Sequence, residues 1–109
     1  MLEPVLGATS KERVLVFLTC RGEGYPREIA RFFGTGLRPI QRQMEALEAG
    51  GVLWSRRAGR TRLYAFDPRY PFLKELKSLL ERGLSFYPAG DRQRLRMNRR
   101  RPRKTGKPL

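Results

Sequence analysis

The stretch YPREIARFFGTGLRPIQRQMEALEAGG, residues 25–51, carries the pattern that decides the fold. Proline suits a first helical position and glycine suits a helix end, so Pro26 and Gly34 predict a short helix over residues 26–33. A four-residue connection, residues 34–37, then leads into a longer helix. Two helices joined by so short a turn are typical of a helix-turn-helix.

The longer helix is predicted over residues 37–49, with Gly50 and Gly51 at its end. Pro39 does not interrupt it, because the N–H that proline lacks has no intrahelical partner in the first turn. Apolar residues recur along one side of this helix at helical spacing. The residues of this stripe, which we expect to face the core, are Leu37, Ile40, Met44 and Leu47.

Two segments precede this pair of helices. Residues 10–20 are predicted to be helical, because Thr9 and Glu12 have the spacing of a capping box and apolar residues follow at helical spacing. Residues 1–8 are expected to form an irregular lead-in, since a proline and a glycine within them discourage a helix. Cys20, at the end of the apolar run, is interpreted as a small buried residue.

A hairpin and a last helix follow. Residues 52–57 and 61–66 are rich in strand formers, and the connection between them contains glycine, which predicts a β-hairpin. An amphipathic helix is predicted over residues 70–82. Its apolar side either completes the core or forms a dimer seam. The residues on that side are Phe72, Leu73, Leu76, Leu79 and Leu80.

The order of these elements is that of a winged helix-turn-helix. The sequence therefore predicts an α+β fold that is mainly α, with three N-terminal helices, a β-hairpin wing and a C-terminal helix. The lead-in covers residues 1–8, the winged-helix domain residues 9–86, and a basic tail residues 87–109. The tail is expected to be disordered, because it has too few large apolar residues to offset its ordering entropy.

The charge of the chain points to a polyanionic partner. Among 109 residues, 24 lysines and arginines face 10 acids, which gives a net charge of +14. Nucleic acid is the first partner to consider, and an anionic membrane surface the second. Residues 88–109 hold nine bases and one acid, yet residues 1–87 still hold 15 bases against 9 acids. Duplex DNA is therefore the predicted partner of the domain, and RNA is a further candidate partner for the tail.

Several other classes of function are disfavoured. The chain has no histidine and a single cysteine, so neither an intramolecular disulfide nor a structural zinc site is expected, and no cofactor is predicted. The acids fall at ordinary helix-surface or capping positions and no phosphate-binding glycine loop is present, so we predict no catalytic residue and no enzyme. Without a membrane-length apolar stretch or a signal-peptide pattern, the protein is expected in the cytoplasm.

The helix over residues 37–49 suits the role of the reading helix, which a helix-turn-helix places in the major groove. Arginine can bind guanine, and glutamine adenine, through two hydrogen bonds. The alternative is that its outer residues are ordinary solvated side chains. The predicted base-reading residues are Arg38, Gln41, Arg42 and Gln43.

The hairpin is rich in arginine, and no acid occurs between Glu48 and Asp67. A wing that lies along the DNA backbone or in the minor groove would match these charges to phosphates. The predicted wing contacts are Arg56, Arg57, Arg60 and Arg62.

Two further groups of residues allow two interpretations each. Arg27 and Arg31, on one face of the short helix, are candidate phosphate contacts, although the neighbouring Glu28 counts against Arg27. The hairpin aromatics could stack on unpaired bases, but packing of the hairpin against the helices is the preferred interpretation. These aromatics are Trp54, Tyr64 and Phe66.

The segments quoted so far resemble a known family. The runs YPREIAR (25–31), IQRQM (40–44), LEAGGVL (47–53) and RRAGRTRLY (56–64) are similar to those of the ArsR-like winged-helix regulators, especially small members without a metal site. The resemblance implies a homodimer on a short inverted repeat, read by the helix that matches residues 37–49 and by the wing. Metal-controlled release is not implied, because the cysteine and histidine ligands of the metal-sensing members are missing.

Two alternatives to sequence-specific DNA binding stay open. The basic tail could dominate, which would give a nonspecific DNA- or RNA-binding architectural protein. The leucine-rich side of the last helix could instead dock a partner, which would give a winged-helix protein-interaction module.

Overall fold

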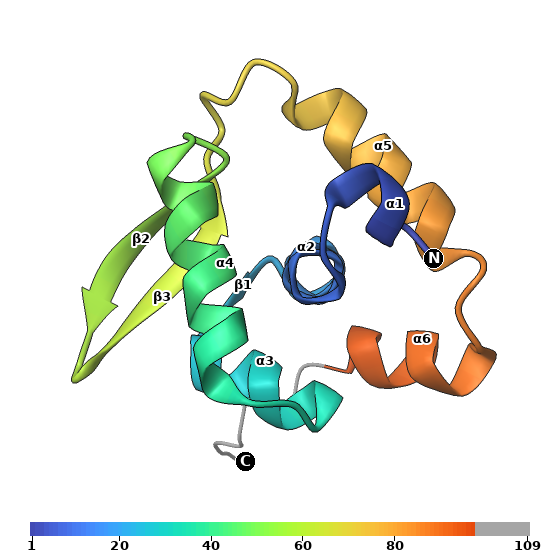
Figure 1. Cartoon of the computed structure of the whole chain (residues 1–109), viewed down its shortest axis with the longest axis horizontal. Helices are drawn as coiled ribbons and strands as arrows, with labels where there is room; N and C mark the ends of the chain where they lie inside the picture. The colour runs from blue at the N-terminus through green and yellow to red at the C-terminus, as the bar shows by residue number, and fades with distance from the viewer. Residues whose placement is uncertain (98–109) are drawn as a thin grey trace, which may run out of the picture.

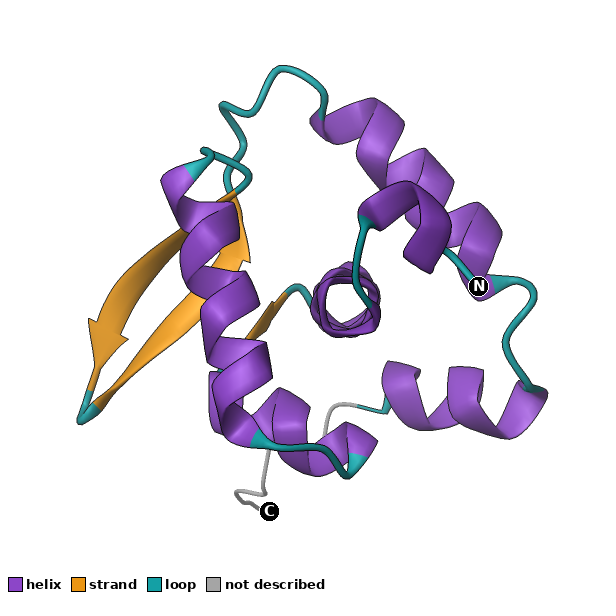
Figure 2. Cartoon of the chain, in the orientation of Figure 1, coloured by secondary structure: helices purple, strands orange, loops and turns teal. Residues whose placement is uncertain are grey.

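The computed structural model describes residues 1–97, and over that range it contains six helices and one three-stranded antiparallel sheet. Helices surround the centre of the molecule, and the strands lie together at one side (Figure 2). In chain order the elements are α1 (Glu3–Leu6), α2 (Thr9–Arg21), β1 (Glu23–Gly24), α3 (Pro26–Phe33), α4 (Leu37–Ala49), β2 (Leu53–Ala58), β3 (Thr61–Phe66), α5 (Leu73–Leu84) and α6 (Ala89–Arg96).

Helix α2 is the centre of the core. Five successive residues, 14–18, are almost completely buried. A helix on a protein surface buries one stripe only, so a helix buried on all sides must be covered from every direction. Figure 1 shows this directly: α2 is seen end-on, with the other helices and the sheet arranged around it.

The helix-turn-helix has the predicted boundaries. Helix α3 begins at Pro26 and ends at Gly34, whose positive φ of 64° is a conformation that glycine adopts without strain. Helix α4 covers Leu37–Ala49 and keeps Pro39 within its first turn. Its apolar stripe faces the core as expected, with Ile40 and Met44 fully buried.

The hairpin is one residue tighter than predicted. Strand β2 extends to Ala58, which pairs with Thr61, so only Gly59 and Arg60 form the loop. Gly59 has a φ of 67° and no residue other than glycine has a positive φ in the described range 1–97, which fits a type II′ turn. The short strand β1, which the sequence did not indicate, pairs with the other edge of β3.

The aromatic residues of the hairpin divide between its two faces. Tyr64 and Phe66 belong to the core, as predicted. The same prediction is wrong for Trp54, which is 41% exposed. Successive side chains on a strand point to opposite faces, and Leu53, its neighbour, already takes the buried face.

The first eight residues are not the irregular lead-in that the sequence predicted. Pro4 lies in the first turn of α1, where its missing N–H leaves no bond unmade, and Gly7 ends the helix with a φ of 97°. Leu2 is buried against Gly83 of α5. Leu2 is therefore part of the core, and Leu6 packs partly against it.

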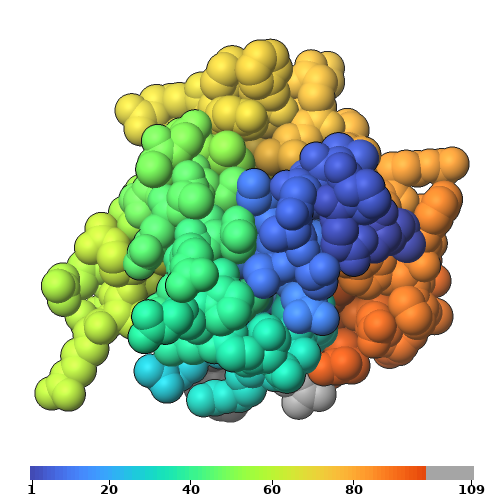
Figure 3. Space-filling view, viewed as in Figure 1, coloured from blue at the N-terminus to red at the C-terminus, as the bar shows by residue number. Residues whose placement is uncertain are grey.

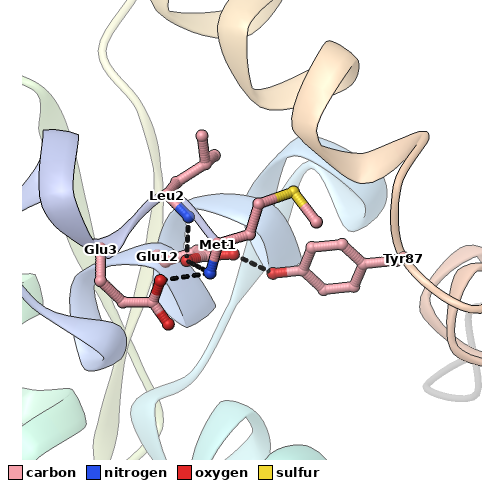
Figure 4. A network of polar contacts seen from close by, with 5 residues as sticks. All are labelled: Met1, Leu2, Glu3, Glu12 and Tyr87. Atoms are coloured by element: carbon pink, nitrogen blue, oxygen red, sulfur yellow. Dashed lines mark hydrogen bonds and ion pairs between the residues drawn. The ribbon is translucent and has the colours of Figure 1, made fainter.

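The predicted capping box at the start of α2 is also wrong. The residue before the helix is Ala8, and no side chain caps the helix there. The Glu12 carboxylate instead accepts hydrogen bonds from the backbone N–H of Leu2 at 2.9 Å and from the Tyr87 hydroxyl (Figure 4). The amino group of Met1 completes this network by pairing with Glu3 and Glu12.

The apolar side of α5 is split between core and solvent. Leu80 is fully buried, and Leu73 and Leu76 pack partly against the core. Phe72, just before the helix, is 62% exposed and Leu79 is 36% exposed. The core role therefore holds for three of the five residues, and the dimer role stays a prediction for the two exposed ones.

Helix α6 corrects the prediction that residues 87–109 form a disordered tail. Residues Ala89–Arg96 are helical, and Leu95 within them is fully buried in the core. Propensity alone is a weak guide for such a short, polar segment, and a buried side chain overrides it. Residues 98–109 of the predicted tail lie outside the described residues.

Candidate nucleic-acid interface

The outer face of α4 carries the residues that the sequence assigned to base reading. Arg38, Gln41 and Arg42 are exposed, whereas Gln43 is half-buried. Because Ile40 and Met44 fix the opposite side of the helix in the core, the exposed residues are held on a rigid element. Their contact with DNA stays a prediction.

Helix α3 braces α4 from below in the view of Figure 1, and the two pack against each other. The start of α3 is fixed by a hydrogen bond of 3.2 Å from the backbone N–H of Tyr25 to the Glu28 carboxylate. Arg27 and Arg31 are exposed on this helix. The Glu28 carboxylate, whose place next to Arg27 counts against a phosphate contact there, lies 3.6 Å from the Arg21 guanidinium.

The wing projects from the body of the molecule, as the space-filling view in Figure 3 shows. All four of its predicted contact residues are exposed. Arg57 and Arg62 lie directly opposite each other on the two strands. Because like charges repel, this pair destabilises the hairpin when no anion is bound to it. The Arg56 guanidinium lies 3.8 Å from the Glu23 carboxylate, and both side chains are about half exposed. An ion pair this exposed contributes little to the stability of the fold.

A short chain of hydrogen bonds joins α4 to the wing. The Ser55 hydroxyl donates to Glu48 of α4 at 2.8 Å and accepts from the Arg62 side chain at 2.9 Å. Tyr64 lies opposite Ser55 on the neighbouring strand. Burial raises the pKa of the Tyr64 phenol, and the negative charges of Glu48 and Glu45 raise it further. Ser55 could not be identified from the sequence, because only the register of the hairpin brings it opposite Tyr64 and next to Arg62.

This chain of contacts makes a testable prediction. Replacing Ser55 with alanine should weaken binding to every duplex by about 3- to 10-fold, because one hydrogen bond contributes about 0.5–1.5 kcal/mol and here it holds Arg62 and the wing in place. The loss is measured by fluorescence anisotropy on several duplexes. Thr61→Ala is the matched control, since Thr61 is an exposed hydroxyl residue in the same hairpin. Equal effects of the two substitutions would contradict the positioning role.

The arginines of this region are largely unpaired. Residues 25–62 contain eight arginines and three glutamates. Within the described range 1–97, six of these guanidinium groups form neither an ion pair nor a hydrogen bond with the protein. They are Arg27, Arg31, Arg38, Arg42, Arg57 and Arg60. Their donors are available to an external anion.

Other kinds of site receive no support from the described part of the chain. Residues 1–97 contain no group of three histidine, cysteine or acidic side chains that could hold a metal ion. Cys20 is half-buried, and this burial raises the pKa of its thiol. No helix in the same range is long and apolar enough to span a membrane.

Comparison with solved structures agrees with this architecture. No protein-family model matches the sequence, and no curated protein matches it significantly. Among solved structures, the apo form of a double mutant of ZitR from Lactococcus lactis is similar, with a TM-score of 0.55 and 16% sequence identity. The match covers 86% of this chain and 80% of the ZitR chain. At this identity the likeness concerns the fold alone, and that fold is the winged helix-turn-helix.

Proposed function

We propose that this protein binds duplex DNA in a sequence-specific manner and acts as a transcriptional regulator. The observation that carries the proposal is a set of six exposed arginines on α3, α4 and the wing that have no ion-pair or hydrogen-bond partner within residues 1–97. Unpaired cations gathered on one helix-turn-helix and its hairpin are the electrostatic footprint of a polyanion. The likeness to ZitR supports the proposal, because ZitR is a transcriptional regulator and the two chains have a common fold.

In the proposed complex, α4 lies in the major groove. Arg38 and Arg42 would each present two donors to a guanine, and Gln41 and Gln43 would pair with adenines. These contacts supply the sequence preference. The wing arginines and Arg27 and Arg31 of α3 would bind phosphates, which fixes the register of α4 but carries no sequence information. The wing residues are Arg56, Arg57, Arg60 and Arg62.

Membership of the ArsR-like regulators is part of the proposal, and it rests on the resemblance of residues 25–64 and on the fold. In line with that resemblance, we propose a regulator that is not an enzyme and whose DNA binding is not controlled by a metal ion.

A homodimer is also proposed, with α5 at its seam. Phe72 and Leu79 are exposed near and on this helix, and large apolar side chains in such positions often belong to interfaces. Leu79→Glu should therefore shift the protein to a monomer in sedimentation equilibrium, because it would place a charge in an apolar seam. Ser78→Glu, which adds the same charge one residue away, is the control and should leave the dimer intact. A dimer that tolerates Leu79→Glu would exclude this seam.

The proposed function is tested by selection from the whole genome. Full-length protein is incubated with fragmented genomic DNA and excess random competitor at near-physiological salt, and the bound fragments are sequenced. We expect one recurring motif with inverted-repeat symmetry. Uniform recovery would instead support nonspecific binding, and no recovery would support RNA or a protein partner.

A further inference from the structure

An acid lies on the outer face of α4, among the residues proposed to read bases. Glu45 follows Arg42 by three residues and Gln41 by four, and side chains at these spacings lie on the same face of a helix. All three side chains are exposed. The other acid of α4, Glu48, accepts a hydrogen bond from Ser55 of the wing, so Glu45 is the one acid on the outer face of this helix.

The Glu45 carboxylate has no direct partner in the described part of the chain. Within residues 1–97 it forms neither an ion pair nor a hydrogen bond with another group of the protein. Arg42, about one turn earlier on the same face, does not pair with it either. No contact within this range therefore accounts for a carboxylate at this position.

The position of Glu45 is fixed by the core and open to a ligand. Met44 is fully buried and Leu47 is 8% exposed, so the apolar side of this part of α4 is held in place. The next residue along the outer face is Ala49, which is exposed and is the last residue of the helix. A methyl group does not reach over the carboxylate, whereas a longer side chain would. A base edge can therefore approach Glu45 from the outer side.

The chemistry of the major groove restricts what a carboxylate can bind there. Both DNA strands carry phosphate charges, so a carboxylate in the groove is unfavourable unless a base donates a hydrogen bond to it. The donors at the major-groove edge are the N4 amino group of cytosine and the N6 amino group of adenine. Adenine also presents the N7 acceptor beside its amino group, and this acceptor repels the second carboxylate oxygen. Cytosine presents no such acceptor and is therefore the base that suits a glutamate.

We propose that Glu45 reads a cytosine by accepting a hydrogen bond from its N4 amino group. This inference rests on the proposed function and deepens it, because it names one base of the motif and the residue that selects this base. Residues three apart in a helix are about 4.5 Å apart along its axis, and neighbouring base pairs are about 3.4 Å apart. The cytosine should therefore lie within about one base pair of the guanine bound by Arg42.

The base preference of Glu45 is tested on the motif that the wild-type full chain selects. Duplexes that carry each of the four base pairs at each motif position are compared in competition, with wild type, Glu45→Gln and Arg42→Ala. The position at which Arg42→Ala loses its preference identifies the guanine. Within about one base pair of it, the wild type should prefer cytosine by about 5-fold or more. Glu45→Gln should lose that preference and favour adenine instead, because glutamine forms two hydrogen bonds with adenine.

Binding to random duplex separates base reading from simple repulsion. Glu45→Gln removes a negative charge, so it should bind random duplex more tightly than the wild type while it discriminates less between bases. Glu81→Gln removes the same charge from an exposed position on α5 and should change no base preference. Equal gains for Glu45→Gln on all duplexes, with every base preference unchanged, would overturn the proposal. Selection of no motif by the wild-type chain would instead overturn the proposed function, and this inference with it.

Discussion

Replacing both Arg38 and Arg42 with alanine is expected to lower affinity for the selected motif by at least about 30-fold, while binding to random duplex falls much less. Each bidentate contact with a base contributes about 1–3 kcal/mol of discrimination, so two such contacts contribute at least about 2 kcal/mol. Competition between motif and random duplex at fixed salt measures the ratio. The fold should survive, because both side chains are exposed and the buried side of α4 is untouched.

Arg60→Ala is the control for this result. Arg60 lies in the loop of the wing, exposed and without a protein partner in the described residues, and we propose that it binds a phosphate. Its loss should weaken binding to motif and random duplex alike and reduce the salt slope by about 0.9. If both variants weakened the two duplexes equally, α4 would not be the element that reads the sequence.

The helix-turn-helix could be predicted from the sequence because its boundaries are local signals. Proline favours the start of a helix and glycine its end, and both preferences depend only on the residue itself. The predicted start of α3 at Pro26, its end before Gly34 and the end of α4 before Gly50-Gly51 therefore agree with the structure. The exposed face of α4 followed from the 3.6-residue period of its apolar stripe. The wing followed from a glycine between two runs of strand formers.

The contacts that fix α1 and α6 could not be predicted in this way. Arg21 and the Leu95 carbonyl are 74 residues apart, and Glu12 and the Tyr87 hydroxyl are 75 residues apart. No local pattern encodes such pairs. The composition around Leu95 even favours disorder, because one large apolar residue among polar ones gives no helical stripe. Tertiary contacts decide the structure of this segment.

The second large effect is expected from Glu12. Its carboxylate is buried, with a side-chain exposure of 5%, and it joins α2 to Leu2 and Tyr87 (Figure 4). Glu12→Ala would leave the Leu2 N–H and the Tyr87 hydroxyl without this acceptor. A buried donor left unsatisfied costs about 1–3 kcal/mol, so the free energy of unfolding should fall by about 2–5 kcal/mol. Urea denaturation, followed by circular dichroism, measures the loss.

Two milder variants separate the hydrogen bonds from the charge. Glu12→Gln keeps an acceptor of the same length, so it should lose less stability than Glu12→Ala. Tyr87→Phe removes only the hydroxyl, and its cost should be about 1 kcal/mol. A Glu12→Ala protein as stable as the wild type would show that water replaces the carboxylate at this position.

The Tyr87 hydroxyl also gives this network a pH dependence of known sign. Burial, followed by the hydrogen bond to Glu12, raises the pKa of Tyr87 above its ordinary value of 10. A group with a raised folded-state pKa stabilises the fold below the unfolded pKa, and that contribution is lost as the pH rises through the folded value. The stability advantage of the wild type over Tyr87→Phe should therefore be constant from neutral pH to about pH 9 and decrease above pH 10. An advantage that decreased on acidification instead, between neutral pH and about pH 5, would mean that a different group controls this junction.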